Sequence, residues 1–349
     1  MPPRLLVRTK ESEDRSQEEP SEFYIDMYSI GDADSFLLWK NRDFMLVDTG
    51  RRENAADIIN LLAKREVDTL KALVITHYDS DHIGSYPAVI DYMLEQRNIY
   101  GHETIKHIYA RKYTKVQLDI LPEDRYRNYI RFINGLLRYE NRTEEELPLE
   151  PLPGTDVVEK MSDELYGTGT GLWIFPFKGN PCGSFTLDSQ VQIVWLNRAA
   201  SYLRENSAPK QLAGQVNNDS LVFKAVYSCR SALFLGDMGQ SGLRDLIQYN
   251  SFALNSDILK IAHHGHIGSS PEYFIAEVHP ILSAVTTTLD SKPDNPPFLN
   301  RLEELTSNLI NFGALIYSGD RPGDYTTIVI RTRELKIYAK NASVAPYFC

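Results

Sequence analysis

The stretch Thr76–Ser85, THYDSDHIGS, brings four potential metal ligands together within six residues. They are His77, Asp79, Asp81 and His82, and they come just after the apolar run LKALVI, which has the composition of a short buried strand. Residues that follow such a strand lie at the edge of its sheet, where functional loops are found. Imidazole and carboxylate groups bind Zn²⁺, Mn²⁺ or Fe²⁺, so the pattern H-x-D-x-D-H indicates a metal site. The alternative is a polar helix start, with the aspartates capping the helix and the histidines on the surface.

Three further predicted strands end in residues of the same chemical types. FMLVDTG leaves Asp48 after its apolar part, SALFLGDM leaves Asp237, and DILKIAHHGH leaves His263, His264 and His266. A buried carboxylate is costly unless a cation or a hydrogen-bond donor compensates it. One such ending is explained by a cap or a turn, but four separate endings favour a shared metal site.

The composition is that of a globular protein. The chain has 349 residues, 42% of them hydrophobic and 24% charged, which is enough for one large domain or two ordinary ones. The net charge of −10 argues against indiscriminate coating of nucleic acid, although a local basic patch is compatible with it. Three cysteines, Cys182, Cys229 and Cys349, are too few and too scattered for a disulfide framework or a cysteine zinc site.

Neither a run of 18 apolar residues nor a signal peptide is recognised, so we expect no membrane insertion and a cytoplasmic location. Residues 1–21 are rich in charge and poor in apolar residues after Val7, which predicts a disordered N-terminal arm. The remainder, 22–349, is expected to form one domain.

Short strands and amphipathic helices are mixed along this domain. Strands are predicted at 22–30, 35–39, 43–50, 71–76, 191–196, 220–227, 231–237, 257–262, 281–287, 313–318 and 326–332. Helices are predicted around 55–62 and 89–94 and at Ser241–Tyr249, Pro271–Val278 and Pro297–Leu309. Such a mixture predicts an α/β sandwich of two packed sheets with helices on the outer faces.

The segment 101–184 does not show this alternation of short strands and amphipathic helices. It carries a helical stretch, EDRYRNYIRFINGLLRYENR, and then a passage rich in proline and glycine. We interpret it as a helical insertion that folds onto the domain as a cap.

Taken in order, LVDTG, THYDSDHIGS, LFLGDMG and LKIAHHG resemble the motifs of the metallo-β-lactamase fold hydrolases. IGDADSFLL, NNDSLVF and the serines after HHG are similar to those of the soluble hydrolase domain of the bacterial DNA-uptake protein ComEC. The resemblance covers about Phe23 to Tyr338 apart from the insertion. It implies a four-layer αββα sandwich and a metal-dependent hydrolase.

The resemblance also implies a centre of two divalent metal ions, Mn²⁺ or Zn²⁺. His77 and Asp79 would hold the first ion, and Asp81, His82 and His263 would hold the second. Asp237 would bridge the two ions, while Asp48 and Asn218 would support the ligands from behind. Asp81 and His264 are the expected catalytic residues, with His264 contacting the phosphate or the leaving oxygen. A structural hydrogen bond is the other interpretation of His264.

Two departures from the family pattern affect the first ion. Asp79 stands where the family usually has a histidine, and GQVNNDSLVF lacks the further histidine that usually precedes the bridging aspartate. Because oxygen ligands favour Mn²⁺ or Mg²⁺ over zinc, we expect a centre that accepts Mn²⁺ and holds its first ion weakly.

The insertion suggests a substrate. Between Gly101 and Arg142 there are nine Lys or Arg residues against five acids, an excess of 9 − 5 = +4, and five tyrosines lie among them. Cations and aromatic rings suit a groove for single-stranded nucleic acid. The proposed substrate-binding residues are Arg125, Arg127, Arg131 and Tyr129. An ordinary amphipathic helix, with its arginines in solvent and Tyr129 packed inward, explains the same pattern.

The leading hypothesis is therefore a phosphodiesterase or nuclease that acts on DNA, RNA or a nucleotide. One alternative is a small-molecule hydrolase of the lactamase, lactonase or thioesterase type, because a metal centre alone does not select the bond. Another is a degenerate domain that serves as a binding module. The sequence identifies no protein partner.

Overall fold

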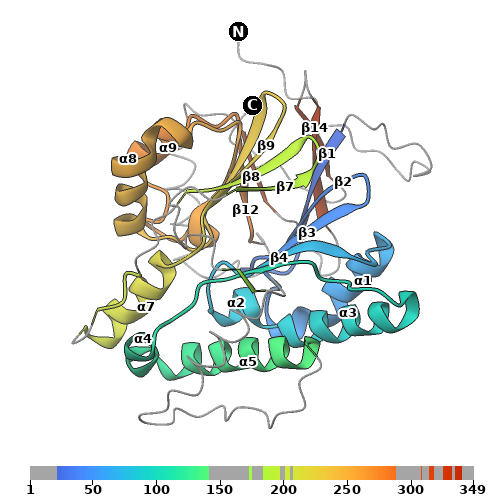
Figure 1. The fold of residues 1–349 in the computed structure, drawn as a ribbon. Helices are drawn as coiled ribbons and strands as arrows, with labels where there is room; N and C mark the ends of the chain where they lie inside the picture. The colour runs from blue at the N-terminus through green and yellow to red at the C-terminus, as the bar shows by residue number, and fades with distance from the viewer. Residues whose placement is uncertain are drawn as a thin grey trace.

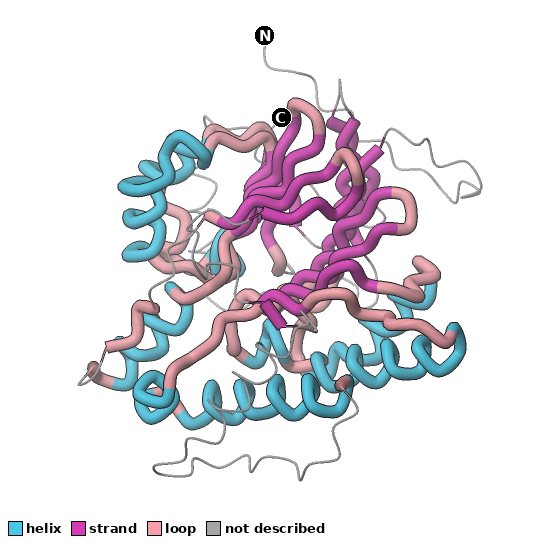
Figure 2. The backbone as a smooth tube through the Cα atoms, viewed as in Figure 1, coloured by secondary structure: helices cyan, strands magenta, loops and turns pink. Residues whose placement is uncertain are grey.

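The computed structural model describes residues 22–140, 173–174, 184–196, 201–204, 207–287, 308, 314–317, 325–331 and 335–339. Within them two β-sheets pack face to face, and helices lie on the outer side of each sheet (Figure 1). The strands form the centre of the molecule and the helices its periphery (Figure 2). This arrangement confirms the predicted αββα sandwich.

The first sheet has eight strands in the order β15-β14-β1-β2-β3-β4-β5-β6. In chain order they are β1 Glu22–Tyr28, β2 Phe36–Lys40, β3 Asp43–Val47, β4 Leu70–Val74, β5 Ile108–Tyr109, β6 Trp173–Ile174, β14 Tyr325–Arg331 and β15 Leu335–Ala339. From β15 to β3 neighbouring strands are antiparallel, and from β3 to β6 they are parallel. The C-terminal strands therefore return to the sheet that β1 begins.

The second sheet has seven strands in the order β13-β12-β11-β10-β9-β8-β7. They are β7 Ser184–Asp188, β8 Val191–Trp195, β9 Phe223–Tyr227, β10 Arg230–Phe234, β11 Ile258–Lys260, β12 Leu282–Val285 and β13 Ala314–Tyr317. The strands β10 to β13 run parallel, so residues that follow β10 and β11 meet at one edge of the sheet.

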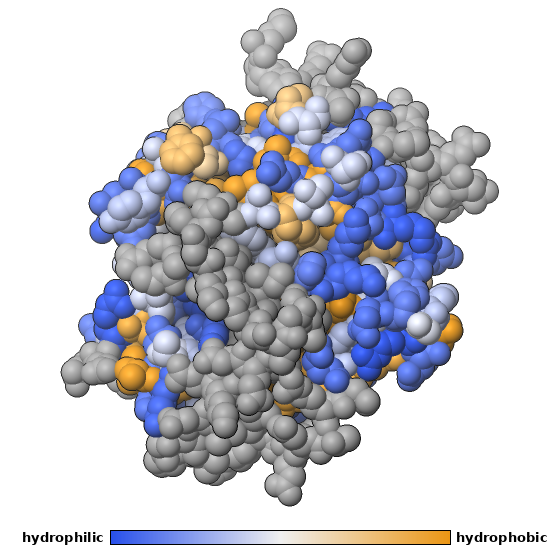
Figure 3. Space-filling view, in the orientation of Figure 1, coloured by the Kyte–Doolittle hydropathy of each residue, from blue (hydrophilic) through white to orange (hydrophobic). Residues whose placement is uncertain are grey.

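The helices form two outer layers. Their bounds are η1 Arg52–Asn54, α1 Ala55–Lys64, α2 Ser80–Ile83, α3 Tyr86–Tyr100, α4 Lys115–Ile120, α5 Glu123–Tyr139, α7 Pro209–Asn218, α8 Gln240–Leu254, η2 Ala262–Gly265 and α9 Glu272–Val278. Helices α1, α3 and α5 share a core with the first sheet, and α8 and α9 share one with the second. Hydrophilic side chains cover the α1 and α3 side of the molecule, at the lower right of Figure 3.

The alternation of side chains in β1 explains the layers. Phe23, Ile25 and Met27 point into the core between the sheets, whereas Tyr24 and Tyr28 belong to the core under the helices. Successive side chains of a strand point to opposite faces, and here both faces are covered, so all seven residues of β1 are buried.

The segment 101–184 contributes to both the sheet and the helical layer. The predicted helix is α5, and its buried face joins the core of α1 and α3. The segment also supplies β5 and β6, which extend the first sheet beyond β4. The arm at 1–21, most of the proline- and glycine-rich passage and the predicted helix Pro297–Leu309 except Asn308 lie outside the described residues. None of the described helices is both long and apolar enough to span a bilayer.

Candidate metal centre

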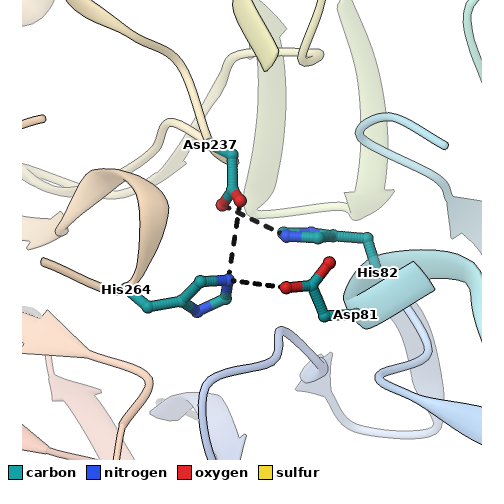
Figure 4. Close-up of side chains that lie close together, drawn as sticks. All are labelled: Asp81, His82, Asp237 and His264. Carbon is teal, nitrogen blue, oxygen red and sulfur yellow. Dashed lines mark ion pairs between the residues drawn. The ribbon is translucent and has the colours of Figure 1, made fainter. Parts of the chain in front are cut away.

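Four side chains converge where the two sheets meet, and they come from three separate loops (Figure 4). Asp81 and His82 lie on α2, just after β4 of the first sheet. Asp237 follows β10, and His264 lies in η2 after β11, both in the second sheet. Each of the four offers a ligand atom, and these atoms all lie within 4.8 Å of one another. We name Asp81, His82, Asp237 and His264 the four-ligand cluster.

The spacing of the four-ligand cluster suits a divalent cation. His82 Nε2 lies 3.1 Å from Asp237 Oδ1, and His264 Nε2 lies 3.5 Å from Asp237 Oδ2 and 3.7 Å from Asp81 Oδ2. Two ligands at ~2.1 Å from a tetrahedral zinc ion are about 3.4 Å apart. These three separations are close to that value, and the remaining ones lie within 4.8 Å.

His82 is oriented by residues behind it. Its Nδ1 lies 2.8 Å from Asp48 Oδ2, and Asp48 also accepts hydrogen bonds from the amide and the hydroxyl of Thr76 (2.7 and 2.6 Å). An ionised carboxylate only accepts hydrogen bonds, so Nδ1 of His82 carries a proton. Nε2 is therefore the nitrogen that can bind an ion once it has lost its own proton. Asp48 thus lies behind His82, on the side of the ring opposite Nε2.

His264 is oriented in the same manner from the second sheet. Its Nδ1 lies 3.2 Å from the carbonyl oxygen of Thr286 and 2.9 Å from the Thr286 hydroxyl. The backbone of His263 and His264 is left-handed, with φ of 49° and 50°. Non-glycine residues seldom adopt this conformation, and it is held here by Ser269, whose hydroxyl donates to the Ala262 carbonyl (2.9 Å).

Buried nitrogen atoms that make no well-aligned hydrogen bond support the presence of an ion. His77, His82 and His264 are buried, and within the described part of the chain the Nε2 atom of none of them makes such a bond, although those of His82 and His264 lie 3.1 and 3.5 Å from the Asp237 carboxylate. An unpaired buried polar atom is costly and calls for an explanation such as an ion. The donor set of two imidazoles and two carboxylates fits a divalent transition metal.

Charge is tightly balanced around the cluster. Burial alone would lower the pKa of His82 and of His264, but Asp237 and other carboxylates outweigh it and raise both pKa values. Burial would raise the pKa of Asp237, but His82 and His264 lower it well below its ordinary value. Each imidazole is thus stabilised as a cation when no metal neutralises the carboxylates.

The two neighbouring histidines lie at different depths. His264 belongs to the four-ligand cluster, and His263, which the sequence predicts to hold the second ion, lies at its edge. The side chain of His263 is 33% exposed, and its Nε2 lies 3.7 Å from Asp237 Oδ2. The left-handed turn brings the Nε2 atoms of His264 and His263 to 3.5 and 3.7 Å from the same Asp237 oxygen, Oδ2. His266 lies against His263, with ring centroids 4.4 Å apart.

The residues predicted for the first ion lie farther apart than those of the four-ligand cluster. His77 Nε2 lies 3.9 Å from Asp237 Oδ2 and 4.0 Å from Asp79 Oδ2. Asp79, however, directs both carboxylate oxygens to Arg125 of α5 (2.8 and 2.7 Å). Burial raises the pKa of Asp79 to about 6 although Arg125 opposes this shift. Neither His77 nor Asp79 belongs to a set of three close ligands among the residues that the structure describes.

Asn218 supports the Asp237 loop from behind. Its Oδ1 accepts hydrogen bonds from the amides of Gly239 and Gly242, both at 3.0 Å, at the start of α8. Ser220 acts nearby, because its hydroxyl accepts from the Asp237 amide (3.1 Å). These contacts fix the turn that presents Asp237, so Asn218 acts on the site through the backbone.

Two charged residues at the centre are absent from the sequence prediction, Asp34 and Lys260. Lys260 is buried, pairs with Asp34, donates to the Gly236 carbonyl (3.0 Å) and lies 3.8 Å from Asp237 Oδ1. Asp34 accepts from the Thr286 hydroxyl and lies 3.7 Å from His82 Nδ1. Asp34 stands in the motif IGDADSFLL and Lys260 in the motif LKIAHHG. A lysine at the end of a buried apolar strand seldom lacks an acidic partner, and this signal in the sequence could have revealed the pair.

The predicted substrate-binding residues are largely engaged within the protein. Tyr129 is fully buried against Tyr78, so its ring offers no face to a base. Arg127 pairs with Glu123 one turn away, and Arg131 donates to Asn128 Oδ1 (2.9 Å). Arg125 binds Asp79. For Tyr129 the inward-packed interpretation of the helix is therefore correct, and the stacking role is not.

The facing sheets, their outer helices and the His/Asp cluster at the sheet edge define the metallo-β-lactamase fold. In agreement with this, the family model described as Metallo-beta-lactamase superfamily matches residues 29–158. The chain therefore has the fold of that superfamily, with side chains suited to binding a divalent metal at the expected edge.

Solved structures with a similar fold share little sequence with this chain. The metallo-beta-lactamase fold protein YhfI from Bacillus subtilis is 13% identical, with 82% of this chain and 92% of that chain covered and a TM-score of 0.42. CmlA, a diiron beta-hydroxylase from Streptomyces venezuelae, is 11% identical over 90% of this chain and 55% of that chain, with a TM-score of 0.45. A diphosphatase from the PhnP family is 10% identical over 75% and 85%, with a TM-score of 0.36. No curated protein matches the sequence.

Proposed function

We propose that this protein is a metal-dependent hydrolase of phosphodiesters, with nucleic acid as the leading substrate. The observation that carries the proposal is the four-ligand cluster, in which two oriented imidazoles and two carboxylates face one point. A divalent ion at that point supplies Lewis acidity and lowers the pKa of water. Hydrolysis is the chemistry that such an ion supports without a further cofactor.

The residues of this chain would divide the remaining tasks. Asp48 and Thr286 hold His82 and His264 in the tautomer that leaves Nε2 free for the ion. Because His264 is buried in the cluster, we assign the acceptance of a proton from the attacking water to His263 instead. His263 reaches solvent beside Asp237, and burial lowers its pKa, so its imidazole is neutral near pH 7 and can accept that proton.

The choice of a phosphodiester depends on the sequence motifs and the basic segment. The motifs resemble those of the ComEC hydrolase domain, and the Gly101–Arg142 segment has an excess of +4 in a chain of −10. The second candidate is a small-molecule hydrolase. It is favoured by one observation, the engagement of Arg125 and Arg127 with acids on the protein itself, which leaves fewer cations for a long polyanion.

The test is cleavage of labelled single- and double-stranded DNA and RNA, with Mn²⁺, Mg²⁺ or Zn²⁺ supplied separately. We expect His264→Ala to lose activity by about 10²-fold or more, as removal of a group that stabilises a transition state does. His102→Ala, which changes an exposed histidine away from the centre, is the matched control and should retain activity. Turnover of chromogenic esters or lactams with indifference to every oligonucleotide would support the second candidate and overturn the first.

A further inference from the structure

The carboxylate of Asp79, a predicted ligand of the first ion, is bound by an arginine. Arg125 Nε lies 2.8 Å from Asp79 Oδ1 and Nη2 lies 2.7 Å from Asp79 Oδ2, so the contact is bidentate. The side chains are 22% and 12% exposed. A charge-assisted fork of this kind is stronger and more specific than a single surface ion pair.

Helix α5 holds this arginine in place. Asn128 stands one turn after Arg125, and its side-chain amide donates to the Tyr78 carbonyl (2.8 Å). On the same helix face, Tyr129 and Phe132 pack against the Tyr78 ring, with centroids 5.0 and 5.5 Å away. Residues three and four apart on a helix share a face, so α5 fastens the 78–79 loop at several adjacent points. Arg125 is therefore a fixed part of the site.

A comparable arginine at the four-ligand cluster makes a weaker contact. Arg51 Nη2 lies 3.3 Å from Asp81 Oδ2 and also donates to the Asp32 carbonyl (3.0 Å), and its side chain is 38% exposed. Only one oxygen of Asp81 is involved. The two halves of the centre thus differ: the fork of Arg125 takes both oxygens of Asp79, whereas Arg51 contacts Asp81 only at Oδ2 and more distantly.

Among the residues that the structure describes, those near the first site offer no compensating ligand. Asn218 is engaged at the start of α8, and Asp219 accepts from the Ser201 hydroxyl and from the Tyr202 amide (2.7 Å). The Ser220 hydroxyl lies 3.4 Å from His77 Nδ1 and accepts from the Asp237 amide, so it is engaged behind the His77 nitrogen that faces the Asp237 carboxylate. The side chains of Asn218, Asp219 and Ser220, in the segment where the family has its further histidine, therefore make hydrogen bonds that stabilise the fold.

We propose that Arg125 takes the place of the first metal ion. Its guanidinium neutralises Asp79, so that the centre holds one tightly bound cation in the four-ligand cluster. A second cation would have to displace Arg125 from Asp79 and sit near its positive charge. The inference deepens the proposed function, since it concerns the ion content of the same site, but it needs no assumption about the substrate.

The experiment is a titration of the metal-free full chain with Mn²⁺, in which the electron paramagnetic resonance signal of free Mn²⁺ counts the ions bound. The wild type should bind one equivalent tightly and a second at least about tenfold more weakly. Arg125→Gln should tighten the second equivalent by about tenfold, because a charge-assisted contact no longer competes for Asp79. Arg138→Gln, on the same helix but paired with Asp91, should titrate as the wild type does.

Two further variants make the result specific. Arg125→Lys keeps the positive charge but loses the bidentate contact with Asp79. The affinity for the second Mn²⁺ equivalent should therefore rise less than in Arg125→Gln. This variant serves as the test if the glutamine variant fails to fold. Adding Asp79→Asn to Arg125→Gln should remove the gain. Two equally tight equivalents in the wild type, or identical titrations for Arg125→Gln and Arg138→Gln, would overturn the inference. A chain with one tight ion that cuts no phosphodiester would instead overturn the proposed function alone.

Discussion

At the scale of single residues, the centre depends on which imidazole nitrogen faces the ion. Asp48 and Thr286 fix this choice for His82 and His264. Residues that hold a ligand from behind are worth about 10–100-fold in metal affinity in known sites. The two oriented histidines are consequently the most sensitive positions for metal binding.

The neighbouring histidines give a direct comparison. We expect His264→Gln to weaken metal binding by about 10²-fold or more, since it removes a ligand together with its hydrogen bonds to Thr286. His263→Gln should change the affinity by less than about threefold, because His263 is outside the four-ligand cluster. Competition with a chromogenic chelator measures both constants. Equal losses in the two variants would contradict the assignment of His264.

Metal binding should also depend on pH. The pKa values of His82 and His264 are raised above the ordinary 6.5, so both imidazoles hold protons above that pH in the metal-free protein. A metal must displace these protons, so its apparent affinity should rise with pH until the raised pKa values are passed. The stability of the metal-free fold should change with pH in the opposite direction. The contribution of the two protonated imidazoles to the free energy of unfolding is complete below pH 6.5 and is lost as the pH rises through their raised pKa values. Calorimetry in buffers of different ionisation enthalpy would detect the released protons, and a flat profile above pH 6.5 would contradict the argument.

Sequence alone could not separate His263 from His264. The two residues are adjacent, both follow β11, and both are histidines. Which one points inward depends on a left-handed backbone at both positions, and this conformation has no clear signature in residue type when glycine is absent. Asp237 and Asp81, in contrast, were predictable from their positions. Asp237 follows the buried apolar strand β10, and Asp81 lies at the start of the helix α2 that follows the buried strand β4.

At the scale of elements, α2 is the most constrained piece of the centre. It has only four residues, yet it carries Asp81 and His82 and lies directly against η1. A Cβ atom on Gly84, at the end of α2, would lie 2.5 Å from both the Arg52 amide nitrogen and the Ser80 carbonyl oxygen. The glycine in HIGS is thus required by the close approach of two backbones.

Gly84→Ala should therefore destabilise the protein by about 1–3 kcal/mol and weaken metal binding, because the clash is with backbone that cannot move aside. Gly214→Ala is the control, since its Cβ would meet nothing within 4 Å in helix α7. Helix propensity predicts that this control stabilises the protein by up to about 1 kcal/mol. Denaturant unfolding of both variants measures the difference, and an unchanged Gly84→Ala would refute the packing argument.

The predictability of the elements follows their length. Strands such as β1, β3 and β10 are recognisable because their apolar runs are buried on both faces. The strands β5 and β6 have two residues each and are set by their neighbours in the sheet, so no local pattern marks them. The positive segment around α5 was recognised, but its pairing with acids from other elements is tertiary information.

At the scale of the whole molecule, the four-ligand cluster joins the two sheets. Asp81 and His82 belong to the first sheet and Asp237 and His264 to the second, so an ion bound by all four cross-links the halves of the sandwich. Because the unfolded chain lacks this site, ion binding adds directly to the free energy of unfolding.

Metal removal should consequently lower the stability of the whole domain. An ion present at 100 times its dissociation constant adds about 2.7 kcal/mol. Its removal by a chelator should lower Tm by about 5 °C. Scanning calorimetry with and without chelator measures the shift, and Asp237→Asn, which lacks one ligand, should show almost none. Independent melting of a small local region, with the main transition unchanged, would argue against the cross-link.

The pairing of β1 with β14 also bears on how the protein is made. Glu22 and Arg331 are partners in this ladder although 309 positions separate them. As the chain leaves the ribosome, one hydrogen-bonding edge of β1 therefore stays open until β14 has also been synthesised. An open strand edge can pair with other chains. Nascent chains are therefore vulnerable to aggregation between the synthesis of β1 and that of β14, and a pause in this interval should lower the yield of folded protein more than a pause after β14.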